Sequence, residues 1–557
     1  MKEVIYILSK IKFFVKDIKL IIKYIKKIDI SIKEFIFMQI LIFLEMVFYL
    51  INPFIMGKII DCISKENGIN KLNYYILFMV IIYIFNIITY RIRSVYILKI
   101  TARVEKKIKL DIFNNILNLD YLYARNINKG LLINNIEDDA MNAASILGEF
   151  LDFIRCIVTV IFILFIMIKI NLLLSLLILI FIPIESLVFL VMGRVIKNKL
   201  EILMKMKDKY LNFINDTLNG LKVINIFNII DKRNNEFKGL TNKIYDKAVQ
   251  KSKLDIDMYI IINIISFISN ILILLVGGYL CLKNIITIGI LVSFNSYSEK
   301  FKTESSNLSS FNSLIQNISI SLERIDNICN KDNYFSNKKE KKSKDLNGEM
   351  ISVKIKNLSF GYIKNNEIIK NFNYEFLKGN IYRIIGENGK GKSTVLDILS
   401  GLYPNNIEEL EINYRRIVEI NEYRKNIAYI DQNSYIFTDT IYQNISLYRN
   451  IDLRSIRKIC KKLNIDDLIM SFPENYNTVL NKKINLSGGQ KQKILIARAF
   501  VEKKEIYIFD EVTSALDREN KMIFYNIINE IKKDSIIILV SHEEILSELT
   551  NVEEIYL

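Results

Sequence analysis

The chain contains 557 residues, one histidine and five widely spaced cysteines without a CxxC pair, so we expect at least two domains and neither a disulfide framework nor a zinc site. Its formal net charge of +16 suits a nucleic acid, an anionic membrane surface or a phosphorylated ligand equally well. However, 51% of the residues are hydrophobic although 24% are charged, so the two kinds must be segregated along the chain, which favours a membrane part joined to a soluble part over a uniformly soluble protein.

Residues 1–30 are apolar but interrupted by lysine every few positions, and they contain no small-residue cleavage site. This pattern predicts a basic amphipathic helix that lies on the cytoplasmic membrane surface, and it argues against a signal peptide. An ordinary solvated helix is the alternative interpretation.

Six apolar runs, each long enough to cross a bilayer as a helix of roughly 20 residues, precede residue 310. The connections after the second and fourth runs are long, helical in pattern and basic, whereas the others are short. Because basic loops stay on the cytoplasmic side, we expect both chain ends and the soluble part to be cytoplasmic, in an integral plasma (inner) membrane protein. The runs lie near 34–56, 73–97, 146–169, 171–193, 256–281 and 284–302, and the last is the most polar.

Two carboxylates, Glu45 and Glu185, fall inside these runs. Because a carboxylate at membrane depth is costly, each is a candidate for lining a substrate or proton route inside the bundle. A neutral glutamate bonded to a neighbouring helix, or a membrane span that ends before the residue, is an equally good interpretation.

The stretch 330–347 is polar and without apolar periodicity, which indicates a linker. Beyond it, short β-type runs alternate with helical patterns, and such alternation predicts an α/β domain with a largely parallel sheet. We therefore expect an N-terminal segment at 1–30, an all-α transmembrane domain of six helices at 31–329, and the α/β domain at 348–557.

The stretch from Gly386 to Ser393 matches G-x-x-x-x-G-K-[ST] directly after a predicted strand and before a predicted helix, the context that a phosphate-binding loop requires. Glycines allow backbone N–H groups to surround a phosphate, Lys392 reaches the β and γ phosphates, and Ser393 can ligate Mg²⁺. The residues predicted to bind ATP here are Gly386, Asn388, Gly389, Gly391, Lys392, Ser393 and Thr394.

A second chemical signal is the buried strand pattern that ends in Asp510 and Glu511. Parallel sheets place their active sites at the carboxyl ends of their strands. Asp510 is suited to hold Mg²⁺, and Glu511 is suited to polarise an attacking water.

Residues Leu486–Gln490 read LSGGQ. With the phosphate loop and the acidic strand end, this motif makes nearly the whole chain resemble the ABC transporter family, specifically exporter-type half-transporters in which six membrane helices precede one ATPase domain. The resemblance implies a P-loop ATPase that works as a dimer, with ATP held between the phosphate loop of one subunit and the signature of the other. It implies that Ser487, Gly488, Gly489 and Gln490 bind nucleotide.

Four further residues match family positions. By resemblance, Tyr362 stacks on adenine, although a tyrosine packed on the core is the alternative. Gln432 senses Mg²⁺ and water, Asp517 couples the two sites of the dimer, and His542, the sole histidine, contacts the γ phosphate and the attacking water.

The chain also departs from the family pattern. Leu480, Asn481 and Lys483 stand where exporters generally have glycine, glutamate and glycine, which puts the usual contact of this segment with the opposing subunit in doubt. After His542 we expect the closing strand and helix of the domain to be absent. Loops resembling those of exporters, 128–140 and 215–228, predict coupling helices that dock near Gln432.

Together these features predict an ATP-hydrolysing exporter of an amphipathic, lipid-like or peptide substrate, with ATP and Mg²⁺ as cofactors. We expect it to pair in the bilayer with a second half-transporter, as a homodimer in preference to a heterodimer. The alternatives are an importer with the exporter fold, of the siderophore type, and a non-transport ABC ATPase. The membrane runs argue against a nucleic acid partner.

Overall fold

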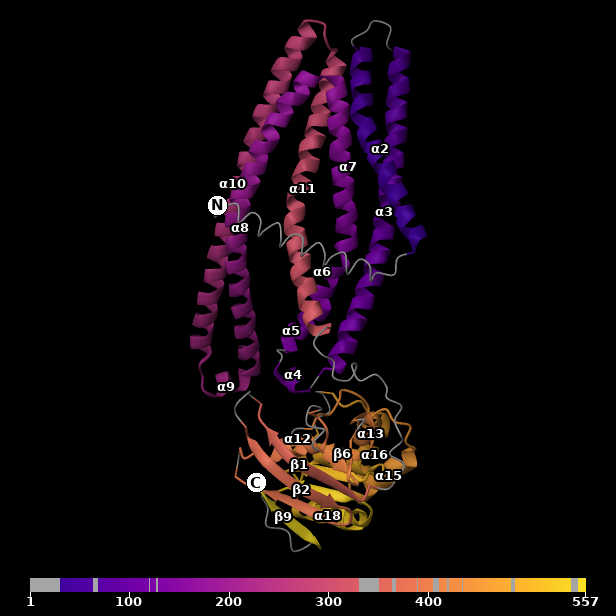
Figure 1. Ribbon diagram of the computed structural model, residues 1–557, viewed down its shortest axis with the longest axis vertical. Coiled ribbons are helices and arrows are strands. Elements are labelled where there is room, and N and C mark those ends of the chain that lie inside the picture. Colours follow the sequence, from indigo (N-terminus) through magenta and orange to yellow (C-terminus); the bar gives the residue numbers. More distant parts are fainter. Residues whose placement is uncertain are drawn as a thin grey trace. The chain divides into compact units, whose positions relative to one another are not determined.

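The computed structural model describes residues 31–63, 69–119, 121–126, 129–329, 350–362, 367–387, 389–403, 410–417, 420–432, 434–481, 486–541 and 549–557 (Figure 1). The chain divides into two compact units. One comprises Met1–Phe113 and Gly130–Cys329, and the other comprises Asn114–Lys129 and Asn330–Leu557. The predicted N-terminal amphipathic helix at 1–30 and the linker at 330–347 lie outside the described residues.

The first unit is all-helical, and a long helix covers each of the six predicted runs. Among the described residues, five helices are long and apolar enough to cross a membrane, whereas α11 is not, because hydroxyls, amides and four charged side chains, Glu299, Lys300, Lys302 and Glu304, interrupt its apolar positions. The long helices are α2 (Ile32–Ile63), α3 (Ile69–Leu117), α7 (Ile146–Ile170), α8 (Leu172–Asn219), α10 (Ile230–Leu282) and α11 (Ile288–Cys329), and the short ones are α5 (Lys129–Asn134), η1 (Asn135–Asp139), α6 (Ala140–Ala144) and α9 (Leu221–Ile226).

The long helices of this unit form two groups. Helix α11 lies against α2 and α7, and α8 lies beside α10 along most of their length, as Figure 1 shows. Met46, Ile163, Leu174, Ile273 and Phe294 belong to one buried cluster that joins α2, α7, α8, α10 and α11. Many other large apolar side chains of these helices are exposed, which is the arrangement expected where lipid is the solvent.

A contact between two glycines sets the approach of α2 to α11. A Cβ placed on Gly57 would lie 1.8 Å from Ser293 Oγ and 2.4 Å from the Gly289 carbonyl oxygen, and a Cβ on Gly289 would lie 2.0 Å from the Gly57 carbonyl oxygen. The Asp61 carboxylate accepts hydrogen bonds of 2.9 Å from the Gly289 N–H and from Thr287 Oγ1, so it caps the start of α11. Small residues thus allow the two backbones to meet.

We therefore expect Gly57→Ala to destabilise the helical unit by about 3 kcal/mol, because the added methyl group meets backbone that cannot move without separating the helices. Gly278→Ala is the matched control: Gly278 is also helical, but a Cβ there has open space, so the substitution is expected to stabilise by about 0.5–1 kcal/mol. Thermal unfolding of the purified variants measures both effects. Equal midpoints would contradict the glycine contact.

Charged side chains from four helices also meet inside this unit. Arg93 of α3 pairs with Glu45 of α2 at 2.6 Å and with Asp152 of α7 at 2.9 Å. Arg155 of α7 pairs with Glu304 of α11 at 3.2 Å. Glu45 is therefore bonded to a neighbouring helix, as one interpretation of its sequence position expected, but through an ion pair with Arg93.

The second unit contains two sheets. The antiparallel sheet has the order β2-β1-β4-β5, and the other, β6-β7-β8-β3-β9, is parallel throughout, which confirms the predicted α/β class. The strands are β1 (Ser352–Phe360), β2 (Ile369–Leu377), β3 (Ile381–Ile385), β4 (Leu410–Ile412), β5 (Arg415–Arg416), β6 (Ile427–Ile430), β7 (Ile506–Asp510), β8 (Ile536–Val540) and β9 (Val552–Tyr556). The helices are α4 (Tyr121–Asn126), α12 (Lys392–Leu399), α13 (Ile420–Lys425), α14 (Ile441–Ser446), α15 (Leu453–Lys462), α16 (Asp466–Ser471), η3 (Asn475–Asn477), α17 (Gly488–Phe500), α18 (Arg518–Ile531) and η4 (Lys532–Asp534).

Strands β7 and β8 are buried at every position and lie in the middle of the parallel sheet. Their continuous apolar sequences reflect helices or strands packed on both faces. Strand β9 pairs in parallel with β3, with Val552 opposite Ile381. The expectation that a closing strand is absent is therefore wrong, because the short run VEEIY pairs with β3, buries Ile555 and extends the sheet by one strand.

Candidate nucleotide-binding site

Four strands deliver the candidate residues to one edge of the parallel sheet. The phosphate loop follows β3, Gln432 follows β6, Asp510 ends β7 with Glu511 directly after it, and the segment before His542 follows β8. Because all these strands are parallel, their carboxyl ends share an edge. His542 itself lies outside the described residues, as does Asn388 of the phosphate loop.

The phosphate loop bends through two glycines in the left-handed region, Gly389 at φ 86° and Gly391 at φ 94°, and then enters α12. Lys392 is buried, and its Nζ donates a 2.6 Å hydrogen bond to the Gly386 carbonyl oxygen. A lysine held against its own loop keeps its charge at the place where backbone N–H groups and a helix N-terminus favour a phosphate.

Gly391→Ala is expected to weaken ATP binding by about tenfold or more, because alanine is strained at this φ and its Cβ would lie 3.1 Å from the side chains of Ile368 and Ile369. Gly389→Ala is the matched control, since it has the same kind of φ but open space around the Cβ, and its loss is expected to be smaller. Titration with a fluorescent ATP analogue measures both affinities. An equal or larger loss in Gly389→Ala would show that crowding at Gly391 is unimportant.

The two acids at the end of β7 have different surroundings. Asp510 is buried, and burial raises the pKa of its carboxyl group, while a hydrogen bond with Ser393 acts in the opposite direction. Glu511 has a left-handed backbone, φ 51°, and its N–H donates a 3.0 Å hydrogen bond to the Val540 carbonyl oxygen on β8. This turn directs the Glu511 carboxylate away from the strand, and Gln432 Nε2 donates a 2.7 Å hydrogen bond to it.

Tyr362 is part of an aromatic group next to α12. Its hydroxyl lies 2.9 Å from Thr394 Oγ1, and its ring meets the rings of Phe360 and Tyr403 edge to face. Tyr121 of α4 lies 6.2 Å from Tyr403, centroid to centroid, so this short helix contacts the aromatic group.

The signature segment has its own well-defined geometry. Ser487 caps α17 in a capping box: its Oγ accepts from the Gln490 N–H at 3.2 Å, and Gln490 Oε1 accepts from the Ser487 N–H at 2.9 Å. A Cβ on Gly489 would lie 3.0 Å from the Ala515 carbonyl oxygen, and Asp517 caps α18 by accepting from the Asn520 N–H at 2.9 Å. Within the described residues, no hydrogen bond joins Ser487 or Gln490 to the phosphate loop. The first two residues of α17 are the glycines of the signature, so no side chain covers the start of this helix.

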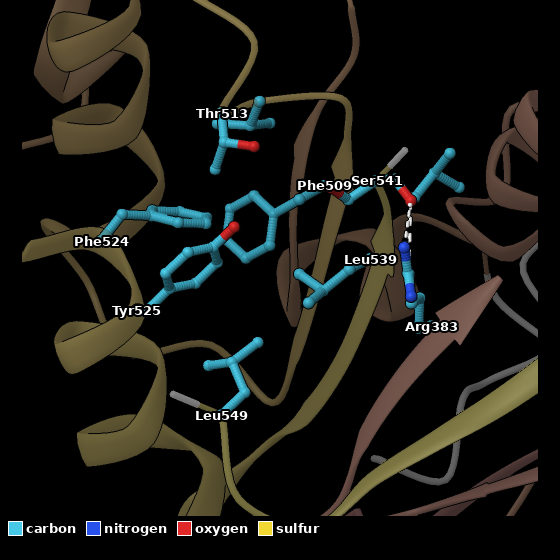
Figure 2. A pocket seen from close by; sticks show the side chains of 10 residues that line it. Arg383, Phe509, Thr513, Phe524, Tyr525, Leu539, Ser541 and Leu549 are labelled. Carbon is cyan, nitrogen blue, oxygen red and sulfur yellow. Dashed lines mark hydrogen bonds between the residues drawn. The ribbon is translucent and has the colours of Figure 1, made fainter. Parts of the chain in front are cut away.

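Sequence reasoning missed Arg383, which binds the backbone at the candidate edge of the sheet. Its Nη2 and Nε donate hydrogen bonds of 3.1 and 3.3 Å to the Ser541 carbonyl oxygen, directly before His542 (Figure 2). Figure 2 also shows Phe509, Phe524 and Tyr525 lining the neighbouring pocket. A charged residue inside the otherwise apolar run IYRII was the signal that could have identified Arg383.

Comparison with known proteins covers both units. Residues 35–303 match the family described as ABC transporter transmembrane region, and residues 369–514 match the family described as ABC transporter. An export ATP-binding/permease protein of Rickettsia typhi is 27% identical over 541 residues, which is 94% of this chain and 92% of the relative. The multidrug resistance-like ATP-binding protein MdlA of Buchnera aphidicola is 28% identical over 513 residues, which is 90% of this chain and 87% of the relative.

Proposed function

We propose that this chain, a member of the ABC transporter family, works as a homodimer that exports an amphipathic, lipid-like or peptide substrate. The chain is an exporter-type half-transporter, that is, an integral membrane protein with a transport-coupled ATPase. The observation that carries the proposal is the convergence of the phosphate loop, Asp510, Glu511 and Gln432 on one sheet edge, in a chain whose other unit supplies membrane-length helices.

The ATPase chemistry follows from this edge. The phosphate loop and Lys392 hold the β and γ phosphates, and Glu511 is the general base that takes a proton from the attacking water. Gln432, hydrogen-bonded to Glu511, orients that carboxylate. The ring of Tyr362 stacks on the adenine, and its hydroxyl is anchored on Thr394.

The same residues fit a Mg²⁺ ion. The Ser393 hydroxyl, the Asp510 carboxylate and the Gln432 amide are the hard oxygen donors that this ion prefers, and the Ser393 side chain lowers the pKa of the Asp510 carboxyl group. When bound, Mg²⁺ would neutralise charge on the transferred phosphate. Asp510, buried at the strand end, would hold the ion close to Ser393.

Dimerisation completes the site. Ser487 and the two glycines after it present a capped helix N-terminus with little bulk, which suits the γ phosphate of a nucleotide bound to the second subunit. Gly489 of the signature lies against the Ala515 carbonyl oxygen, two residues before Asp517, so closure at one site can be transmitted to the other. His542 completes the proposed catalytic set. The termini and the ATPase domain, 348–557, lie on the cytoplasmic side in this proposal, because the long basic loops do.

ATP hydrolysis by the chain alone, purified into nanodiscs, tests the homodimer. Turnover that depends on Mg²⁺ and persists without any other subunit supports it. A folded chain that binds ATP but does not hydrolyse it would show that a different partner subunit is required.

The direction of transport is tested in inside-out membrane vesicles, with ATP added to the external buffer. ATP-dependent uptake of a fluorescent amphipathic substrate into the vesicles supports export. ATP-dependent loss of a preloaded substrate would show import and overturn the direction proposed.

A further inference from the structure

Arg383 lies in the middle of β3, the strand that leads into the phosphate loop. In the parallel sheet it pairs with Leu539 of β8 on one side and with Glu554 of β9 on the other. Its side chain is only 12% exposed. Because a charge held this far from water is costly without partners, the guanidinium needs fixed acceptors for its N–H groups.

The acceptors of Arg383 come from both neighbouring strands. Nη1 donates a hydrogen bond of 3.2 Å to the Glu554 carboxylate on β9, which compensates the charge. Nη2 and Nε donate hydrogen bonds of 3.1 and 3.3 Å to one carbonyl oxygen, that of Ser541, directly after β8 (Figure 2). Since the donors of a planar guanidinium are fixed relative to one another, two of them on one oxygen restrict where that carbonyl group lies. The side chain therefore fixes the end of β8 to β3.

The carbonyl group before this one anchors the turn of the proposed general base. The Val540 carbonyl oxygen accepts a 3.0 Å hydrogen bond from the Glu511 N–H, and Glu511 has a left-handed φ of 51°. Val540 also pairs with Asp510 in the β7–β8 register. Of two consecutive carbonyl groups, the first thus anchors Glu511 and the second is anchored by Arg383. A displacement at the end of β8 would carry the Glu511 turn with it.

The demands of hydrolysis set the size of the expected effect. A general base works when its carboxylate is within hydrogen-bond reach of the attacking water, and a misplacement of about 1 Å costs up to roughly a hundredfold in rate. ATP binding depends on the phosphate loop and Tyr362 in the proposed function, and it does not need this accuracy at Glu511. Loss of the Arg383 hydrogen bonds should therefore lower turnover and leave the affinity for ATP nearly unchanged.

We propose that Arg383 is a positioning residue for ATP hydrolysis, which acts by fixing the end of β8 and, through it, the turn of Glu511. The inference rests on the proposed function and deepens it, since it assigns the support of the general base to one side chain of β3. The Ser541 carbonyl group also belongs to the peptide bond with His542, another residue of the proposed catalytic set.

Arg383→Met removes the hydrogen-bond donors and keeps most of the apolar stem. We expect its rate of ATP hydrolysis in nanodiscs, expressed per ATP-binding site, to fall about tenfold, with the Kd for a fluorescent ATP analogue within about twofold of wild type. Arg383→Lys keeps the charge and one donor toward Ser541 but loses the planar fork, so its expected loss of turnover is about threefold. Wild-type turnover in both variants would overturn the proposal.

Glu554→Gln is the matched control. It removes the ion pair and leaves both hydrogen bonds from Arg383 to Ser541, so its turnover is expected to stay within about twofold of wild type. A loss as large as that of Arg383→Met would assign the effect to the β3–β9 ion pair, against the proposal.

A double-mutant cycle separates positioning from a merely structural role. In the Glu511→Gln background, Arg383→Met is expected to slow single-turnover hydrolysis of radiolabelled ATP by less than about twofold further, because the base that Arg383 positions is already absent. A further loss of about tenfold would show that Arg383 acts independently of Glu511, and the proposal would be wrong.

Hydrogen–deuterium exchange of the Glu511 amide, which is bonded to Val540, gives a readout that needs no hydrolysis. We expect this exchange to be about tenfold faster in Arg383→Met, and about threefold faster in Arg383→Lys, which replaces it should the methionine variant not fold. Unchanged exchange contradicts the inference. Wild-type hydrolysis without these differences defeats this inference alone, whereas faster exchange in a chain that binds ATP but never hydrolyses it defeats the proposed function alone.

Discussion

Replacement of Glu511 by glutamine is expected to lower the rate of ATP hydrolysis by about a hundredfold or more while the affinity for ATP stays within about twofold of wild type. Glutamine has the shape of glutamate but cannot take a proton from water. The phosphate loop and Tyr362 are untouched by the change, so binding is retained.

The local geometry makes this substitution a clean one. The left-handed turn at Glu511 is anchored by its own N–H on the Val540 carbonyl oxygen, which glutamine preserves. Gln432 Nε2 donates to the Glu511 carboxylate now and can donate to the amide oxygen of the variant. The expected loss therefore reports the missing base and not a collapsed loop.

Steady-state hydrolysis in nanodiscs and titration with a fluorescent ATP analogue measure the two quantities. Glu530→Gln is the matched control, because Glu530 lies on α18 and pairs with Lys462 at the surface of the same unit, so its turnover is expected to equal that of wild type. A loss below about tenfold in Glu511→Gln would place the general base elsewhere.

Arg93→Met is expected to destabilise the helical unit by about 3–5 kcal/mol, the usual result of removing one partner from a buried ion pair. Arg93 is 8% exposed, and it forms ion pairs with both Glu45, at 2.6 Å, and Asp152, at 2.9 Å. Without it, Glu45 has to be buried as an uncompensated charge or take up a proton.

The partner residues allow that explanation to be checked. Asp152 is partly exposed and also pairs with Arg155 at 3.4 Å, so most of the loss is assigned to Glu45. The double variant Arg93→Met with Glu45→Gln should therefore recover a large part of the stability lost in Arg93→Met. Thermal unfolding followed by circular dichroism measures the series.

Arg103→Met serves as the control for this series. Its guanidinium pairs with Glu34 while 61% exposed, and such a pair contributes about 1 kcal/mol or less. If Arg93→Met costs no more than Arg103→Met, or if the double variant is as unstable as the single one, the buried pair does not stabilise the bundle.

Several features were predictable because they depend on a short stretch of chain. The six long helices cover the apolar runs, since a run that satisfies its own backbone in lipid has to be helical wherever it lies. The phosphate loop was equally predictable, because glycine is needed at the left-handed positions that Gly389 and Gly391 adopt.

Other features could not be read in advance. Glu45 was expected either to line a route or to be neutral, and its pairing with Arg93 depends on how two distant segments pack. The strand β9 was missed because five residues carry too little pattern, and its pairing with β3 decides it. The sixth run, 284–302, was expected from its pattern, but its packing against α2 and α7 as part of the longer helix α11 depends on contacts between distant segments.

The sequence by itself determined the family, the order of a helical membrane part and an α/β ATPase part, and the residues of the phosphate loop, because local periodicity, apolar length and backbone requirements are written in consecutive residues. Only the tertiary structure decided that Gln432 donates a hydrogen bond to Glu511 and that Arg93 forms an ion pair with Glu45. Each of these outcomes depends on side chains far apart in the chain, whose charges are satisfied by packing alone.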